Sequence, residues 1–205
     1  MIAAFPPPAR RIGPDNTTRE AVFMTTLTAK NGTTIEVRPL ADGDAPLLAR
    51  FNAELSEASR SCFLPHAYDA ETLAAIIARA EQGADRAYIA MAGEDIAGYF
   101  FLWEFETDVP VLGIGLADAW QNQGLGRRFL EILIGDARNA GRTGIELTTL
   151  PDNARAFALY ESLGFVHIGD TDNVAGDGRT VRERVMFLAL QPGAAPPERN
   201  FGPPV

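Results

Sequence analysis

Two glycines, Gly124 and Gly126, lie where an apolar, strand-like segment at residues 109–117 gives way to an amphipathic helical pattern. Backbone N–H groups at the start of a helix have no intrahelical partners, and the helix dipole favours negative charge there. Glycines let the backbone approach a ligand closely, because no Cβ stands in the way. A strand, a glycine loop and a helix in this order therefore predict a site for a pyrophosphate group.

The spacing of these glycines differs from two common phosphate motifs. It is not the Gly-x-Gly-x-x-Gly of a dinucleotide fold, and no Gly-Lys-Ser/Thr follows as in a P-loop. Taken alone, the loop could equally be a glycine turn that binds nothing.

A second segment, residues 147–165, follows one predicted strand later. The two segments together resemble the GCN5-related N-acetyltransferase (GNAT) family. Gln121-x-x-Gly124-x-Gly126 is similar to the family's pyrophosphate loop, Gln/Arg-x-x-Gly-x-Gly/Ala. Asn153-x-x-Ala156-x-x-x-Tyr160-Glu161-x-Leu163-Gly164-Phe165 is similar to its second signature. The predicted element order resembles the family from about residue 33 to 190.

The resemblance implies acetyl-CoA as co-substrate, with no metal, and it implies a role for each matching residue. The backbone of Ile114, Gly115 and Leu116 would pair with the pantetheine arm, and the Leu116 N–H would polarise the thioester carbonyl. Asn153 would contact the coenzyme from the start of a helix. The residues implied around the pyrophosphate are Gln121, Asn122, Gln123, Gly124, Leu125, Gly126 and Arg127.

Tyr160 has the most specific implied role, protonation of the departing thiolate. A phenol has an intrinsic pKa of ~10, close to that of an alkyl thiol, so the proton transfer is nearly matched. The alternative is a core tyrosine on a helix face shared with Ala156 and Leu163. Within this motif we favour the catalytic role.

The general base is less well defined by the sequence. Relatives that acetylate protein N-termini often carry a glutamate five residues before the asparagine, and here that position is Thr148. Glu146 lies two residues earlier on the same predicted strand and is the candidate base. Glu104 and Glu106 are alternatives, and each of the three could instead be a plain surface charge.

The charge of the chain bears on its partners. The formal net charge is −9 and the sequence pI about 4.7, so a fold-wide basic footprint for nucleic acid is absent. Carboxylates would attract an ammonium group. They are expected near the edges of the active-site strands, at Glu104, Glu106, Asp118 and Glu146. We therefore expect the acceptor to be a primary amine, on a small molecule or a peptide.

Residues outside these motifs predict little further chemistry. Cys62 is the only cysteine, and with His66 and His167 it makes no recognisable zinc site. We expect Cys62 to be a buried structural thiol and both histidines to be structural. No apolar run approaches the ~20 residues that span a bilayer, and the N-terminus lacks the pattern of a signal peptide. We expect a cytoplasmic protein without a membrane partner.

Periodicity predicts one domain, residues 21–190, between a flexible N-terminal extension, residues 1–20, and a Pro-rich tail, residues 191–205. The expected fold is α/β (α+β), with a mixed, mostly antiparallel central sheet and helices on both faces. Strands are expected at 34–40, 86–92, 96–105, 109–117, 144–150, 165–168 and 181–190. Helices are expected to begin after Asp42 or Asp44 and after Asp69, Gly124 and Asn153. Residues 59–68 and 169–180 are expected to be loops. The resemblance implies that the segment from Ser56 to Tyr68 helps to form the acceptor pocket.

These observations favour an N-acetyltransferase in which the amine attacks acetyl-CoA directly in a ternary complex. Two other functions stay open. One is a module of the same fold that binds acyl-CoA with little or no turnover, and the other is an unrelated nucleotide-binding domain. The family is often dimeric, so the resemblance also allows a homodimer.

Overall fold

The computed structural model describes residues 24–198 and 204. The extension expected at residues 1–20 lies outside the described residues. Residues 191–198 of the Pro-rich tail form neither helix nor strand.

The described chain forms eight strands and five α-helices, with one short 3-10 helix. In chain order the elements are β1 (Thr25–Thr28), β2 (Thr34–Pro39), α1 (Ala45–Glu54), α2 (Glu57–Cys62), α3 (Ala70–Glu81), β3 (Arg86–Ala92), β4 (Asp95–Trp103), β5 (Val111–Leu116), η1 (Asp118–Trp120), α4 (Leu125–Asn139), β6 (Gly144–Thr149), α5 (Ala154–Glu161), β7 (Val166–Val174) and β8 (Thr180–Ala189).

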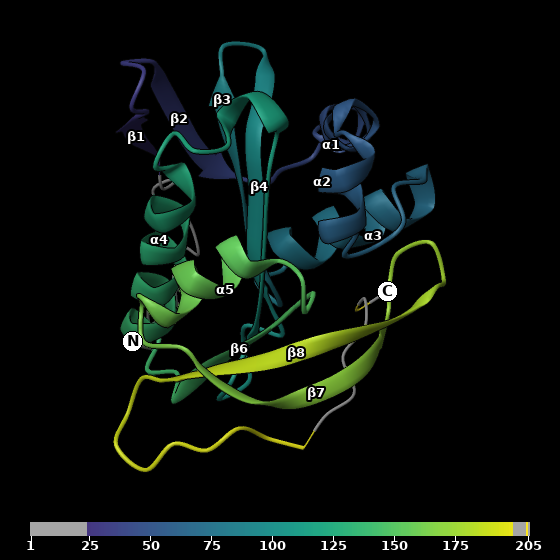
Figure 1. The fold of residues 1–205 in the computed structure, drawn as a ribbon. Helices are drawn as coiled ribbons and strands as arrows, with labels where there is room; N and C mark the ends of the chain where they lie inside the picture. Colours follow the sequence, from purple (N-terminus) through teal and green to yellow (C-terminus); the bar gives the residue numbers. More distant parts are fainter. Residues whose placement is uncertain (1–23, 199–203, 205) are drawn as a thin grey trace, which may run out of the picture.

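The strands form one sheet in the order β1-β2-β3-β4-β5-β6-β8-β7. Every neighbouring pair is antiparallel except β5 and β6. Helices α4 and α5 cover one face, and α1, α2 and α3 lie on the other (Figure 1). The expected fold, a mixed and mostly antiparallel sheet with helices on both faces, is confirmed.

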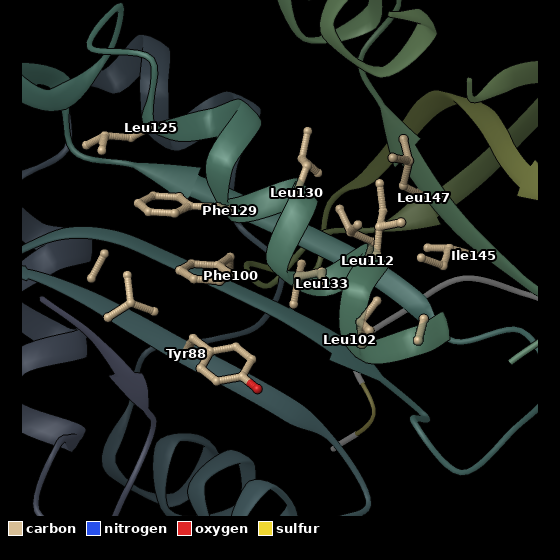
Figure 2. Close-up of a cluster of buried hydrophobic side chains, with 14 of the residues drawn as sticks. Tyr88, Phe100, Leu102, Leu112, Leu125, Phe129, Leu130, Leu133, Ile145 and Leu147 are labelled. Carbon is tan, nitrogen blue, oxygen red and sulfur yellow. The ribbon is translucent and has the colours of Figure 1, made fainter. Parts of the chain in front are cut away.

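The core beneath α4 fixes the helix that follows the glycine loop. Phe129 of α4 stacks on Phe100 of β4 with ring centroids 4.4 Å apart, and both side chains are fully buried (Figure 2). Gly98 makes this possible, because a Cβ there would lie 2.5 Å from the Phe129 ring. Burying two aromatic side chains supplies several kcal/mol, on the order of 1.5–3 each, so the start of α4 is firmly placed.

Three parts of the sequence prediction were wrong. The expected loop at 59–68 begins within α2, whose N-cap Ser56 accepts a hydrogen bond from the Ser59 N–H. The expected loop at 169–180 is largely strand, because β7 and β8 form a long hairpin whose turn is closed by Ala175 N–H donating to Arg179. Strand β1 was not predicted at all. β7 is mostly exposed, so it lacks the apolar alternation that would reveal a strand.

Candidate functional site

A groove of about 750 Å³ runs along the end of β5, the glycine loop, the start of α4 and the inner side of α5. It is of the size that holds a small ligand. All residues predicted to bind the coenzyme border it except Gln123; those bordering it are Ile114, Gly115, Leu116, Gln121, Asn122, Gly124, Leu125, Gly126, Arg127, Asn153 and Tyr160. The structure thus brings together two segments that lie a strand apart in the sequence.

The groove opens where β5 and β6 separate. These two strands share a single register pair, Val111 with Glu146, although each has six residues. Beyond that pair, towards Ile114 and Leu116, β5 has no strand partner on its β6 side among the described residues. Unpaired backbone N–H and C=O groups on this edge of β5 can bind an extended ligand as a neighbouring strand would.

The glycine loop has the backbone shape expected of an anion site. Asn122 and Gly124 both adopt left-handed conformations, with φ of 62° and 81°. Alternation of left- and right-handed residues turns successive N–H groups towards one side of a loop. A Cβ at Gly126 would already be 3.4 Å from Leu159 of α5, so a larger residue there would press on the groove wall.

Gln123 has a role that the sequence did not indicate. Its carbonyl accepts a hydrogen bond from the Lys30 N–H at 3.0 Å, and its side chain accepts one from the Asn31 N–H at 3.1 Å. The turn between β1 and β2 is thereby attached to the glycine loop. As a result, the exposed side chain of Lys30 lies over Gly124 and borders the groove.

The groove is electropositive at its loop end, although the chain is acidic overall. Lys30, Arg127 and Arg155 all border it. Arg127 donates to Ser162 Oγ at 2.5 Å, which joins α4 to the end of α5, and Arg155 donates to Gln121 Oε1 at 3.4 Å. Three cations beside a loop of backbone N–H groups suit a ligand with several phosphates.

Tyr160 lies at the other end of the groove. Asn153 caps α5 by accepting a hydrogen bond from the Ala156 N–H at 3.2 Å, which sets the start of the helix that carries Tyr160. The tyrosine is 6% exposed and packs against Phe165 with ring centroids 5.9 Å apart. Burial raises the pKa of its phenol, and the negative charge of Glu183 raises it further. The phenol therefore stays protonated at neutral pH.

A second cavity, of about 250 Å³, adjoins the groove on the sheet face that carries α2. Five residues border both spaces: Cys62, Phe63, Leu112, Gly113 and Thr148. The second cavity is lined by aromatic and apolar side chains such as Phe101, Trp103 and Val181 on one side. Glu104, Asn173, Arg179 and Glu183 contribute polar groups, and Pro204 near the C-terminus also borders it.

The β7–β8 hairpin packs on the segment after α2 and thereby walls this cavity. The Gly176 N–H donates to the Leu64 carbonyl at 2.9 Å. A Cβ at Gly176 would collide with the backbone of His66, so only glycine permits this approach. Phe63 projects over Gly115, where a Cβ would also collide with its ring. An aromatic side chain therefore stands at the junction of the two spaces.

The carboxylates predicted near the active site lie in different positions relative to the groove and the second cavity. Glu104 borders the second cavity, whereas Glu146, although it shares a strand face with Thr148, is 1% exposed and borders neither space. Asp118 accepts hydrogen bonds from Ser56 and Ser59, and these lower the pKa of its carboxyl group. It therefore fixes the start of α2. Glu183 was not predicted; only the pairing of β8 with β6 and β7 brings it to the cavity.

The remaining candidates lie as follows. Burial lowers the pKa of His66, whose Nδ1 lies 2.6 Å from the Ala67 carbonyl oxygen, so the ring is neutral at pH 7. His167 is an exposed partner of Asp170. Within residues 24–198 and 204, no three His, Cys, Asp or Glu side chains gather as metal ligands would. No helix in that part of the chain is long and apolar enough to cross a membrane.

Known proteins share both this fold and part of the sequence. A family model described as "Acetyltransferase (GNAT) family" matches residues 50–165. The [Ribosomal protein bS18]-alanine N-acetyltransferase of Escherichia coli (strain K12) is 41% identical over 58 residues, which cover 28% of this chain. That match spans 39% of the relative's length, so the chain covers about two fifths of it.

Solved structures match over most of the chain. The GNAT domain of S. lividans PAT superimposes with a TM-score of 0.69 and 18% identity, covering 82% of this chain and 97% of that domain. The putative acetyltransferase yncA of Salmonella typhimurium, solved with acetyl-CoA, gives a TM-score of 0.64 and 20% identity over 80% and 98% of the two chains.

Proposed function

The chain belongs to the GNAT family of acetyltransferases, and on that premise we propose that it transfers an acetyl group from acetyl-CoA to a primary amine. The main support for the proposal is that the groove and the second cavity meet at one point. The groove bordered by the glycine loop and Tyr160 joins a smaller, carboxylate-bearing cavity at Gly113 and Thr148.

Acetyl-CoA would lie along the whole length of the groove. The loop from Asn122 to Gly126 would hold the pyrophosphate, with Lys30 and Arg127 supplying positive charge. The unpaired edge of β5 would hydrogen-bond the amide groups of the pantetheine arm. The structure of yncA, which was solved with acetyl-CoA, supports the same placement by its shared fold.

The second cavity suits an amine. Glu104 and Glu183 give it two carboxylates beside one cation, Arg179, which is paired with Asp177. The excess of negative charge favours an ammonium group. The E. coli relative is named for acetylating an alanine of ribosomal protein bS18. We therefore put a peptide N-terminus first among candidate acceptors and small amines second.

The residues at the junction would divide the work of the reaction. Acetyl-CoA supplies the acetyl group as a thioester. The Leu116 N–H would donate to the thioester carbonyl oxygen and stabilise the charge that develops there. Tyr160, kept protonated by burial, would donate its proton to the departing sulfur. Phe63 would exclude water from the junction.

Release of free coenzyme A thiol tests the proposal. The purified protein would be given acetyl-CoA with a hexapeptide that begins with alanine, spermine, free amino acids or an aminoglycoside. Acceptor-dependent thiol release at rates well above hydrolysis supports the transferase. Calorimetric binding of coenzyme A without release by any amine would instead indicate a binding module. Binding of ATP but not coenzyme A would place the chain's function outside acetyl transfer.

A further inference from the structure

We propose that Glu183, oriented by Asn173, is the carboxylate that receives the ammonium group of the acceptor and takes its proton during acetyl transfer. This inference rests on the proposed function and names the proton acceptor that the sequence motifs leave unassigned. It assigns a residue of the last strand, far from both motifs in the sequence.

The position of Glu183 follows from strand register. The pairing of β6 with β8 ends at Thr149 with Arg184, so Glu183 lies one residue beyond the last paired position. It shares a face of β8 with Val185, which pairs with Thr148. Glu183 thus continues the row that contains Thr148, the residue common to both spaces, past the point where β6 ends.

A neighbouring amide holds the carboxylate in place. Asn173 of β7 donates from Nδ2 to Glu183 Oε2 at 2.8 Å, while its own Oδ1 accepts from the Val174 N–H at 2.8 Å. The second bond fixes which end of the amide faces the glutamate. Both side chains are half-buried and border the cavity, so the carboxylate is oriented yet reachable by a ligand.

The charge of Glu183 also acts on the proposed acid. Its negative charge contributes to the raised pKa of Tyr160, although burial is the larger cause. A carboxylate near the phenol disfavours the tyrosinate and so keeps the proton on the acid until the thiolate forms. One group that accepts a proton and one that donates a proton would therefore flank the reacting carbon.

With these two residues the proton balance closes. A bond forms between the amine nitrogen and the carbonyl carbon, and the carbon–sulfur bond breaks. The ammonium nitrogen loses two protons in turn to the Glu183 carboxylate, one before it attacks and one as the amide forms, and Glu183 passes the first to solvent in between. The sulfur gains one proton from Tyr160. Exchange with solvent then returns both side chains to their starting states.

Other carboxylates are less well placed. Glu146 borders neither space. Glu104 borders the cavity but is exposed, at the end of β4, with a left-handed backbone φ of 53°. It therefore lies closer to solvent than Glu183 and suits attraction of the ammonium group at the mouth of the cavity.

Glu183→Gln tests the proposal in the full chain, with acetyl-CoA and the alanine hexapeptide as substrates. The kcat should fall by about 10²–10⁴-fold, while the calorimetric Kd for coenzyme A stays unchanged. The residual rate should recover as pH rises past ~8, where the peptide's α-amino group becomes neutral without help. Asp172→Asn is the matched control, because it removes one charge from the opposite face of the same hairpin. It should leave kcat within about twofold of wild type.

Each other outcome is decisive. A Glu183→Gln variant with wild-type kcat, or a loss that is equal at every pH, overturns the assignment. So does a large, pH-recoverable loss in Glu104→Gln instead. A wild-type protein that acetylates no amine overturns the proposed function and this inference with it. Asn173→Ala should lower kcat in the wild-type background but have no further effect beside Glu183→Ala, because a positioning residue acts only through its partner.

Discussion

The backbone N–H of Lys30 donates a hydrogen bond to the carbonyl oxygen of Gln123 at 3.0 Å. This contact crosses from one edge of the sheet to the glycine loop. It places a lysine, 94 positions before Gly124, within 3.5 Å of where a side chain on that glycine would begin. The loop end of the groove is therefore built from three separate parts of the chain, the β1–β2 turn, the glycine loop and α5.

Lys30→Gln should weaken coenzyme A binding by about 5–30-fold, which corresponds to ~1–2 kcal/mol for one charge-assisted contact. The loss should shrink as salt rises, because salt screens an exposed charge. Calorimetry at two ionic strengths measures both effects. Arg138→Gln, at the far end of α4, is the control for net charge. Equal affinity of the Lys30 variant and wild type at low salt would contradict this role.

Gly124→Asp should abolish detectable coenzyme A binding, because it places a negative charge where the pyrophosphate is expected. The backbone strain of the substitution must be separated from its charge, since Gly124 has φ of 81°. Gly124→Ala carries the strain alone and should weaken binding less. Gly135→Asp on the same helix carries the charge alone, with no atom within 4 Å of its Cβ. Unchanged affinity in Gly124→Asp would show that the loop does not hold phosphate.

Tyr160→Phe should lower kcat by about 10²–10⁴-fold and leave the Kd for coenzyme A nearly unchanged. The ring keeps its packing against Phe165, and only the proton donor is lost. Steady-state kinetics at pH 7 with the best acceptor measures the change. A variant with the wild-type kcat would make Tyr160 a packing residue of the core.

Alkylation of Cys62 tests coenzyme binding without an acceptor amine. This residue is the only cysteine and borders both the groove and the second cavity. The prediction of a buried thiol was wrong, because Cys62 ends the exposed helix α2. Partial burial raises the pKa of its thiol, with the charge of Asp152 adding to the effect, so alkylation should be slow at neutral pH and faster as pH rises. Saturating acetyl-CoA should slow alkylation by tenfold or more, and mass spectrometry measures the extent of alkylation over time. ATP serves as the comparison ligand, and equal protection by both would argue against a specific coenzyme site.

Tyr99→Phe should raise the free energy of unfolding by about 1 kcal/mol at pH 7. The hydroxyl of Tyr99 is fully buried and has no hydrogen-bond partner among the described residues. Denaturant unfolding at neutral pH measures the change. A loss of stability would indicate that ordered water satisfies the hydroxyl.

The same residue predicts an alkaline effect. Burial raises the pKa of Tyr99 well above 10, so above pH ~10 the unfolded chain loses this proton while the folded chain keeps it. The free energy of unfolding must then fall as pH rises. Removing the hydroxyl should make that fall shallower by up to ~1.4 kcal/mol per pH unit, with Tyr68 and Tyr160 still contributing in the same direction.

Local signals predicted the segments that border the groove. The Asn153 cap, the glycines at the start of α4 and the helical period from Leu125 onward all depend on residues close together in the chain. Each could be identified without knowing what packs against it. The family match and the sheet with helices on both faces confirm the predicted family and fold, and the coenzyme site stays a prediction.

The features that the sequence could not predict depend on contacts between strands and loops that are far apart in the chain. Lys30 reaches the loop through strand β1, whose four residues carry too weak a pattern to identify. Glu183 and Asn173 meet because β7 and β8 form a long hairpin, where a polar loop had been predicted. The flexible extension, the Pro-rich tail and a homodimer stay predictions.

The single register pair between β5 and β6 has a consequence for the lifetime of the protein. Because β5 and β6 pair at one position, further backbone groups of β5 have no strand partner on that side among the described residues. A bound pantetheine arm would satisfy them, so the coenzyme would act as an additional strand of the sheet. A ligand at 100 times its Kd adds about 2.7 kcal/mol to the free energy of unfolding. Degradation in cells often follows the population of opened molecules, which that energy would lower about a hundredfold. A fall in the cellular concentration of acetyl-CoA would then lower the amount of the protein as well as the supply of its substrate.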